Sequence, residues 1–322
     1  AVFRHDSSAA SAGMRLVRPL LLILTASAGL ASLIAWTTST GGSDSATQEA
    51  EALLSALFDS ADQSRSTANF SDHQEGLQRS TAVPAVPPAV ATADPQLRIA
   101  LLSQRPLLQV STQGGAACRS QAGAPVQLGV LNGMITGTTT GLVSCGGSGG
   151  SVFVNGRAYE GTIHLLNRGQ GWLAINQINL ERYVASVVGA EMPSYWNGEA
   201  LKAQAVAARS YGLVHMLRPA DRDWNLGDTT RWQAYSGTIS STDSTIKAAA
   251  ATRGLVLSFK GGLVESLYAA TQEISDEAHG HLGASMSQHG AQQLAQRGLR
   301  FNEILGRYYA GASLARIKTD GQ

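Results

Sequence analysis

The stretch LERYVASVVGAEMPSYWNGEALKAQAVAARSY, residues 180–211, decides the fold. Its first half has one apolar stripe at helical spacing, formed by Leu180, Tyr183, Val184 and Val187. Pro193 has no backbone N–H and disfavours helical geometry at Met192, so the first helix must end near Glu191. Asn197 is suited to cap a second helix. The stretch therefore predicts two helices joined by a bend at Glu191-Met192-Pro193.

Glu191 lies at this bend, at the end of one helix and between two apolar elements. Burial in such a place raises the pKa of a carboxyl, as a general acid working at neutral pH requires. Spacing alone does not separate this role from that of an exposed turn glutamate. The pattern makes Glu191 a candidate acid, with an ordinary surface residue as the alternative.

The composition excludes one class of partner. The chain has 322 residues, a formal net charge of +1, and only 15% charged residues. Proteins that bind nucleic acid carry a basic patch or stripe, and this composition indicates none. We therefore predict no nucleic-acid partner. Hydrophobic residues concentrate beyond about Leu97, where we expect the folded part of the chain.

The N-terminal region contains a targeting pattern. Met14, Arg15 and Arg18 precede the apolar run PLLLILTASAGLASLIAW (Pro19–Trp36). Basic residues followed by an apolar run without acidic residues are typical of a secretory signal or an uncleaved membrane anchor. The run is close to the lower limit of about 17 residues for a spanning helix, so both fates stay open. We expect an exported protein of the cell envelope, either membrane-anchored or released into the periplasm or medium.

Composition and periodicity divide the rest of the chain. A segment rich in Ser, Thr, Ala, Gln and Pro indicates a disordered linker. Short apolar runs separated by glycines follow, among them an expected strand at Val126–Leu131. Strands and helices are then interspersed irregularly, which favours an α+β fold. The expected parts are a signal or anchor (1–36), the linker (37–95), a small β-rich domain (96–155) and a larger domain (156–317).

Two cysteines, Cys118 and Cys145, fall in the expected β-rich domain. In an exported chain we expect them to form a disulfide. Closing such a loop stabilises a fold by roughly 3 kcal/mol on the chain-entropy model. Two cysteines without a CxxC pattern make a poor zinc site, and an unpaired buried pair is the alternative.

Six motifs follow one another along the second half of the chain. They are GRAYEG (Gly156–Gly161), INLERYVASVVGAEMP (Ile178–Pro193), EALKAQAVAARSY (Glu199–Tyr211), DTTRWQAYSG (Asp228–Gly237), AAATRGLVL (Ala249–Leu257) and MSQHGA (Met286–Ala291). In this order they resemble the SpoIID/LytB domain, whose first-described member is a sporulation protein that cleaves peptidoglycan. The shared order of several motifs argues against chance similarity.

The resemblance implies a reaction and its residues. It implies lytic transglycosylase cleavage of glycan strands between N-acetylmuramic acid and N-acetylglucosamine, with Glu191 acting first as acid and then as base. We predict no cofactor and no metal. The alternative is a protein that binds peptidoglycan without cleaving it and activates an N-acetylmuramoyl-L-alanine amidase. The expected substrate-binding residues are Arg209, Gln233, Tyr235, Ser287, Gln288 and His281.

Some interpretations stay open. Arg209 is suited to bind a substrate carboxylate through its planar fork, or to form a structural ion pair. A hydrolase needs a second carboxylate beside Glu191. Its candidates are Glu181, Glu199 and Asp228.

The C-terminal motifs depart from the family pattern. After Tyr268 the chain reads Ala269-Ala270-Thr271-Gln272-Glu273 and lacks the histidine and the glycines of the family pattern, and His281 is one residue out of register. These departures affect the expected shape of the substrate-binding groove more than they argue against common ancestry with the family. His281 also belongs to a group of histidines and acidic residues, but spacing fixes no third ligand, so we predict no metal site.

Overall fold

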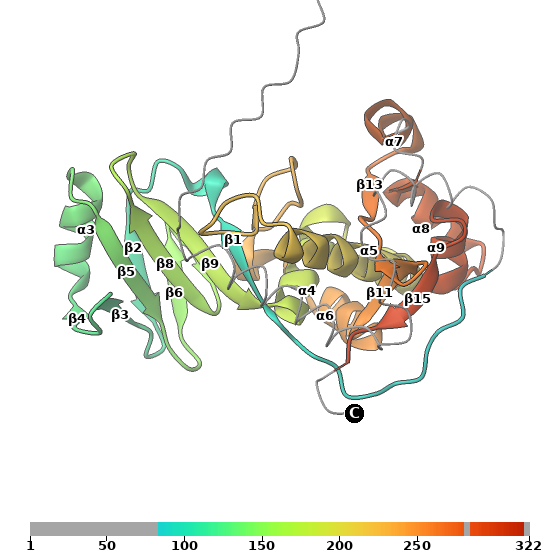
Figure 1. The fold of residues 1–322 in the computed structure, drawn as a ribbon, viewed down its shortest axis with the longest axis horizontal. Coiled ribbons are helices and arrows are strands. Elements are labelled where there is room, and N and C mark those ends of the chain that lie inside the picture. Colours follow the sequence, from blue (N-terminus) through green and yellow to red (C-terminus); the bar gives the residue numbers. More distant parts are fainter. Residues whose placement is uncertain (1–82, 280–283, 319–322) are drawn as a thin grey trace, which may run out of the picture. The chain divides into compact units, whose positions relative to one another are not determined.

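The computed structural model describes residues 83–279 and 284–318, which all belong to the unit Asp44–Gln322 (Figure 1). The predicted signal or anchor, most of the predicted linker, and His281 lie outside the described residues. Within the described ranges, no helix is long and apolar enough to cross a membrane. The structure has helices and several sheets, which confirms the predicted α+β class.

A seven-stranded sheet organises the first part of the described chain (Figure 1). Its order is β10 (Leu226–Gly227), β1 (Gln96–Ala100), β9 (Leu173–Asn179), β8 (Thr162–Asn167), β5 (Gly141–Gly146), β3 (Ala117–Ser120) and β4 (Pro125–Val126). Neighbouring strands are antiparallel except β1 and β10, which are parallel. Strands β8 and β9 form the hairpin that alternating polarity predicts.

This sheet crosses the domain boundary predicted at residue 155. Strand β5 pairs with β8, and β1 pairs with β9, so strands from both expected domains share one hydrogen-bonded sheet. The composition changes near residue 155, but the backbone pairing does not stop there. Strand pairing over such sequence separations depends on tertiary context that a local pattern does not contain.

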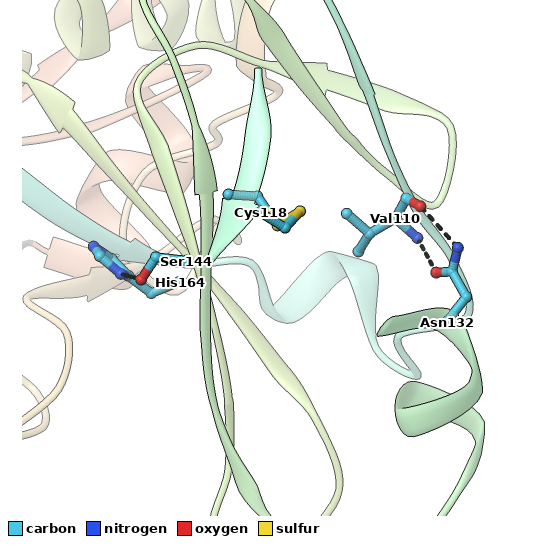
Figure 2. Close-up of a disulfide and its surroundings, with 6 residues drawn as sticks. Val110, Cys118, Asn132, Ser144 and His164 are labelled. Carbon is cyan, nitrogen blue, oxygen red and sulfur yellow. Dashed lines mark hydrogen bonds between the residues drawn. A yellow bond between two sulfur atoms is a disulfide. The ribbon is translucent and has the colours of Figure 1, made fainter. Parts of the chain in front are cut away.

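A second sheet contains β2 (Val110–Gln113), β6 (Ser151–Val154) and β7 (Arg157–Tyr159), and helix α3 (Leu128–Thr136) packs against β2. Figure 2 shows how Asn132 of α3 fastens the helix: its Oδ1 accepts from Val110 N at 2.8 Å and its Nδ2 donates to Val110 O at 3.0 Å. The predicted strand Val126–Leu131 is therefore wrong from Leu128 onward. Its short apolar run fits a strand or a buried helix equally well.

Cys118 of β3 and Cys145 of β5 form a disulfide (Figure 2). The two residues lie directly opposite one another in the antiparallel register. Ser144 comes directly before Cys145 in β5. Its Oγ lies 2.8 Å from His164 Nδ1 on β8, and this contact links β5 to β8. The disulfide separates its cysteines by 27 residues and encloses α3. It therefore links two neighbouring strands of the large sheet, and the loop that it closes contains α3.

Helix α5 (Gly198–Leu217) is the central helix of the other half (Figure 1). It packs against α4 (Leu180–Glu191), α6 (Asp243–Ala251), β11 (Leu255–Phe259), α8 (Gln288–Gln296) and α9 (Phe301–Tyr308). Its buried alanines allow these elements to approach closely. Helix α4 also packs closely on the 3-10 helix η3 (Gly237–Ser240), since a Cβ added at Gly189 would lie 1.9 Å from the carbonyl oxygen of Ser240.

The remaining elements frame the C-terminal region. Strand β11 pairs with β12 (Gly262–Leu263) across the predicted hairpin, and also with β15 (Ser313–Arg316), which the sequence pattern does not predict. Strands β13 (Leu267–Ala269) and β14 (Ser285–Ser287) are parallel neighbours. Helix α7 (Gln272–His279) follows β13 in the chain.

Candidate active site around Glu191

The bend predicted between α4 and α5 presents Glu191 as the last residue of α4. Met192 has extended backbone angles, φ −128° and ψ 143°, and its N–H makes the final helical bond to Val188 O at 2.9 Å. This geometry is what Pro193 imposes on the residue before it. Asn197 then caps α5, because its Oδ1 accepts from Glu199 N at 2.9 Å.

The carboxyl group of Glu191 is largely buried and held at both oxygens. Its Oε1 accepts from the backbone N–H of Ala234 at 2.7 Å, and its Oε2 accepts from Gln288 Nε2 at 3.3 Å. Burial raises the pKa of Glu191, and the two hydrogen bonds oppose the shift without cancelling it. A carboxyl that keeps its proton to higher pH in a fixed position is suited to general acid catalysis.

Three of the sequence motifs meet at this carboxyl. Ala234 belongs to the DTTRWQAYSG motif and Gln288 to the MSQHGA motif, far from Glu191 in the chain. Ser287 positions its neighbour: it caps α8 by accepting from Gly290 N at 3.0 Å, and it is itself buried. The structure thus brings Gln288 to Glu191, and Ser287 holds the turn from which Gln288 extends.

Gln233 and Tyr235 flank Ala234 and are both buried. Gln233 accepts from Tyr183 OH at 2.7 Å through Oε1, while Tyr235 OH donates to Asn176 Oδ1. These bonds hold the chain in place on either side of Ala234. The backbone N–H of Ala234 is thereby directed at Glu191. The structure places both side chains in the core as anchors, whereas the sequence predicts them on the wall of a substrate groove.

Arg209 forms a buried ion pair and does not contact Glu191. Its guanidinium donates from Nε and Nη2 to the two oxygens of Glu181 at 2.8 and 2.7 Å, with side-chain exposures of 0% and 8% for the pair. It also donates to the carbonyl oxygens of Leu255 and Ala249, and Gly254 N donates to Glu181. Of the two open interpretations, the structure contains the ion pair, because a buried guanidinium needs acceptors on every side.

The candidate second carboxylates have other partners. Glu181 is paired with Arg209, and Glu199 bonds Lys202 Nζ at 2.7 Å and Phe301 N at 2.8 Å. Asp228 accepts from Ser103 N at 2.9 Å and fixes the 3-10 helix η2 (Leu102–Gln104) next to β10. Each of these three carboxylates is bonded to groups other than Glu191, Ala234 and Gln288.

Two further features bear on the position of the site. In the part of the chain that the structure describes, no group of three or more His, Cys, Asp and Glu side chains could hold a metal ion. A cavity of about 530 Å³ lies along α4, but its lining includes Glu181, Arg182, Ala185 and Ser186 and not Glu191. By helical geometry these residues face away from Glu191, so the cavity is separate from the candidate acid.

The comparisons agree with the motifs. Residues 168–259 match the model of the SpoIID family, described as Stage II sporulation protein. The resemblance predicted from the motifs is thereby confirmed.

Individual relatives share the same region. The chain is 36% identical over 99 residues to the Amidase enhancer of Bacillus subtilis, and 31% identical over 113 residues to Stage II sporulation protein D of that organism. It is 34% identical over 118 residues to an uncharacterized protein of Brachyspira hyodysenteriae. These matches cover 31%, 30% and 36% of this chain, respectively, and 13%, 33% and 32% of the relatives. The chain therefore matches a third or less of each relative.

The structure adds site residues that sequence reasoning does not single out. The donor to Glu191 from the DTTRWQAYSG motif is the backbone of Ala234, which no side-chain argument identifies. Tyr268 stands out in the sequence only as the start of a motif that departs from the family. It lies on β13 and accepts from Gln233 Nε2 at 2.8 Å.

Arg209→Met is expected to reduce the free energy of unfolding by about 3–5 kcal/mol, because it leaves the carboxylate of Glu181 buried without its partner. Urea unfolding measures this change. The matched control is Arg182→Met, which removes a surface ion pair with Glu160 whose arginine side chain is 64% exposed. That change should cost less than about 1 kcal/mol. Equal effects at the two positions would contradict the structural role of Arg209.

Glu191→Gln is expected to stabilise the fold at neutral pH, by an amount that grows as the pH rises from about 4. Burial raises the pKa of Glu191 in the folded state above its unfolded value. Between these two pKa values the folded state binds more protons, so the free energy of unfolding falls with rising pH through that window, and glutamine carries no such cost. Urea unfolding at a series of pH values tests this.

Glu265→Gln is the control with the opposite sign. The His215 ring, whose Nε2 lies 3.5 Å from Glu265 Oε1, and then Arg218 lower the pKa of Glu265, against the effect of burial. Its stabilising contribution is present above the unfolded pKa and is lost as pH falls through the folded one, so the glutamine variant should be less stable than wild type at neutral pH. If both variants shifted stability in the same direction, the raised pKa of Glu191 would be refuted.

Proposed function

We propose that this protein cleaves peptidoglycan glycan strands as a lytic transglycosylase, with Glu191 as its acid and base. The observation that carries the proposal is the Glu191 carboxyl: it is largely buried, has a raised pKa, and is held by Ala234 N and Gln288 Nε2. The SpoIID match over residues 168–259 and the relative named Stage II sporulation protein D support the same assignment.

The proposed reaction needs only one proton donor. Protonated Glu191 gives its proton to the oxygen between the two sugars, the bond from C1 of N-acetylmuramic acid to that oxygen breaks, and positive charge develops at C1. The resulting carboxylate then takes the proton of the 6-hydroxyl on the same sugar, whose oxygen attacks C1. The products are a free N-acetylglucosamine end and a 1,6-anhydro-muramic end, and Glu191 is protonated again without consuming water.

The surroundings of Glu191 fit this single-carboxyl route better than hydrolysis. Glycosidases that use water or a covalent intermediate generally need two carboxylates flanking the scissile bond. Glu181, Glu199 and Asp228 are bound to other groups of the fold. The raised pKa of Glu191 has burial as its cause, with no contribution from a neighbouring carboxylate. One carboxyl that serves as acid and then as base fits this environment.

We further propose that the protein works outside the cytoplasm, at the cell envelope. The disulfide between Cys118 and Cys145 supports export, because disulfides persist in oxidising compartments. The basic and apolar N-terminal sequence supports a signal or an anchor that would attach the domain to the membrane. The residues between that segment and β1 would allow the domain to reach the wall.

The second candidate is a non-catalytic partner of a cell-wall amidase. One relative carries the name Amidase enhancer and is 36% identical to this chain over 99 residues. In this interpretation the domain binds glycan strands and stimulates an amidase that cuts the stem peptides. The environment of Glu191 favours the enzyme, because a binding role does not require a buried carboxyl with a raised pKa.

Digestion of purified glycan strands, with and without stem peptides, distinguishes the candidates. We expect mass analysis to find 1,6-anhydro-muramic ends after incubation with wild type and none above background with Glu191→Gln. The variant replaces only the acidic group, so circular dichroism and thermal unfolding should show an intact fold.

Three other outcomes would redirect the assignment. Binding of strands without products, together with stimulation of an added amidase, would favour the second candidate. Reducing ends formed with water would indicate a hydrolase. Cleavage that persists in Glu191→Gln would remove Glu191 from the mechanism.

A further inference from the structure

Tyr268 lies beside the Glu191 network without belonging to the bonds described for it. Strand β13 carries Tyr268 and runs parallel to β14, with Tyr268 opposite Met286. Gln288, which bonds Glu191, follows β14 directly in the chain. The pairing of the two strands therefore fixes Tyr268 close to the segment that contacts the candidate acid.

The hydrogen bonds around Gln233 determine the orientation of the Tyr268 hydroxyl. The carbonyl of Ala208 can only accept, so the group facing it at 3.3 Å must be the NH₂ of Gln233. Its Oε1 then accepts from Tyr183 OH at 2.7 Å, and its second N–H donates to Tyr268 OH at 2.8 Å. The Tyr268 oxygen is therefore an acceptor in this bond, and its own proton is directed elsewhere.

Within the part of the chain that the structure describes, that proton has no acceptor, although the hydroxyl is partly buried. By contrast, the buried hydroxyl of the neighbouring Tyr309 has an acceptor, because it donates to Leu267 O at 2.6 Å. Burial and then the charge of Glu191 raise the pKa of Tyr268 well above its ordinary value, so the phenol keeps its proton. Tyr268 is thus a neutral, oriented donor close to Glu191.

We propose that Tyr268 is a substrate-binding residue of this site, whose hydroxyl donates a hydrogen bond to an oxygen of the amino sugar beside the scissile bond. The chain from Tyr183 through Gln233 prepares the donor before the ligand arrives, and preorganised donors lose little freedom on binding. The acceptor is a hydroxyl or acetamido oxygen of the sugar, since a donated hydrogen bond needs a lone pair on the ligand. The proposal rests on the proposed function, that is, on glycan binding at Glu191.

The test measures glycan affinity in a background that cannot cleave. Glu191→Gln is combined with Tyr268→Phe, which keeps the ring and removes only the hydroxyl. Calorimetry with a soluble glycan tetrasaccharide without stem peptides should show affinity about tenfold lower than for Glu191→Gln alone, the loss expected for one buried hydrogen bond. The matched control, Tyr309→Phe in the same background, removes a buried hydroxyl that bonds the same strand, and should reduce thermal stability while leaving affinity unchanged.

The outcomes distinguish a failure of the proposed role of Tyr268 from a failure of the proposed function. Unchanged affinity in the Tyr268→Phe variant would overturn the role of Tyr268 and leave the proposed function standing. An absence of binding by Glu191→Gln and by wild type would overturn both. If Tyr268→Phe does not fold, 3,5-difluorotyrosine at position 268 keeps the hydroxyl and makes it a stronger donor. Tighter binding at a pH where that phenol is neutral would then support the proposal, and unchanged affinity would overturn it.

Discussion

The buried ion pair between Arg209 and Glu181 is the interaction on which the arrangement of helices depends. Arg209 extends from the middle of α5 to the first turn of α4, and its remaining donors bind carbonyl oxygens of Leu255 and Ala249, on β11 and at the end of α6. A charge buried without partners is strongly unfavourable, so these elements can adopt few other relative positions. With the start of α4 fixed in this way, its end, and therefore Glu191, has a defined place.

Because Arg209 is paired with Glu181, its positive charge does not act on the carboxyl of Glu191. The positive charge of Arg209 is neutralised by Glu181 inside the helical layer, whereas Glu191 at the other end of α4 accepts from two uncharged donors, Ala234 N and Gln288 Nε2. A guanidinium beside Glu191 would lower its pKa and oppose acid catalysis. Two neutral donors hold the carboxyl in position, and burial still raises its pKa. Position and acidity are thus set by different parts of the structure.

Local pattern predicts a good part of this fold. The apolar stripe and Pro193 predict α4, its end and the bend, and alternating polarity predicts the hairpin of β8 and β9. What the sequence does not predict depends on contacts between distant segments. The continuation of the sheet past residue 155 and the partner of Arg209 are examples, since neither has a local periodicity. At the site, the bend before Pro193 makes Glu191 a candidate and the family resemblance adds Gln288, but neither identifies a backbone donor such as that of Ala234.

The central claim is that Glu191 in the folded protein keeps its proton to higher pH than an ordinary glutamate. Titration of its side-chain carboxyl by ¹³C NMR in the intact protein, with the resonance assigned by its loss in Glu191→Gln, measures this directly. The account predicts a midpoint clearly above the value of about 4.3 found for glutamate in model peptides. A midpoint at or below that value would contradict it, because the carboxyl would then have given up its proton to solvent before any sugar reached it.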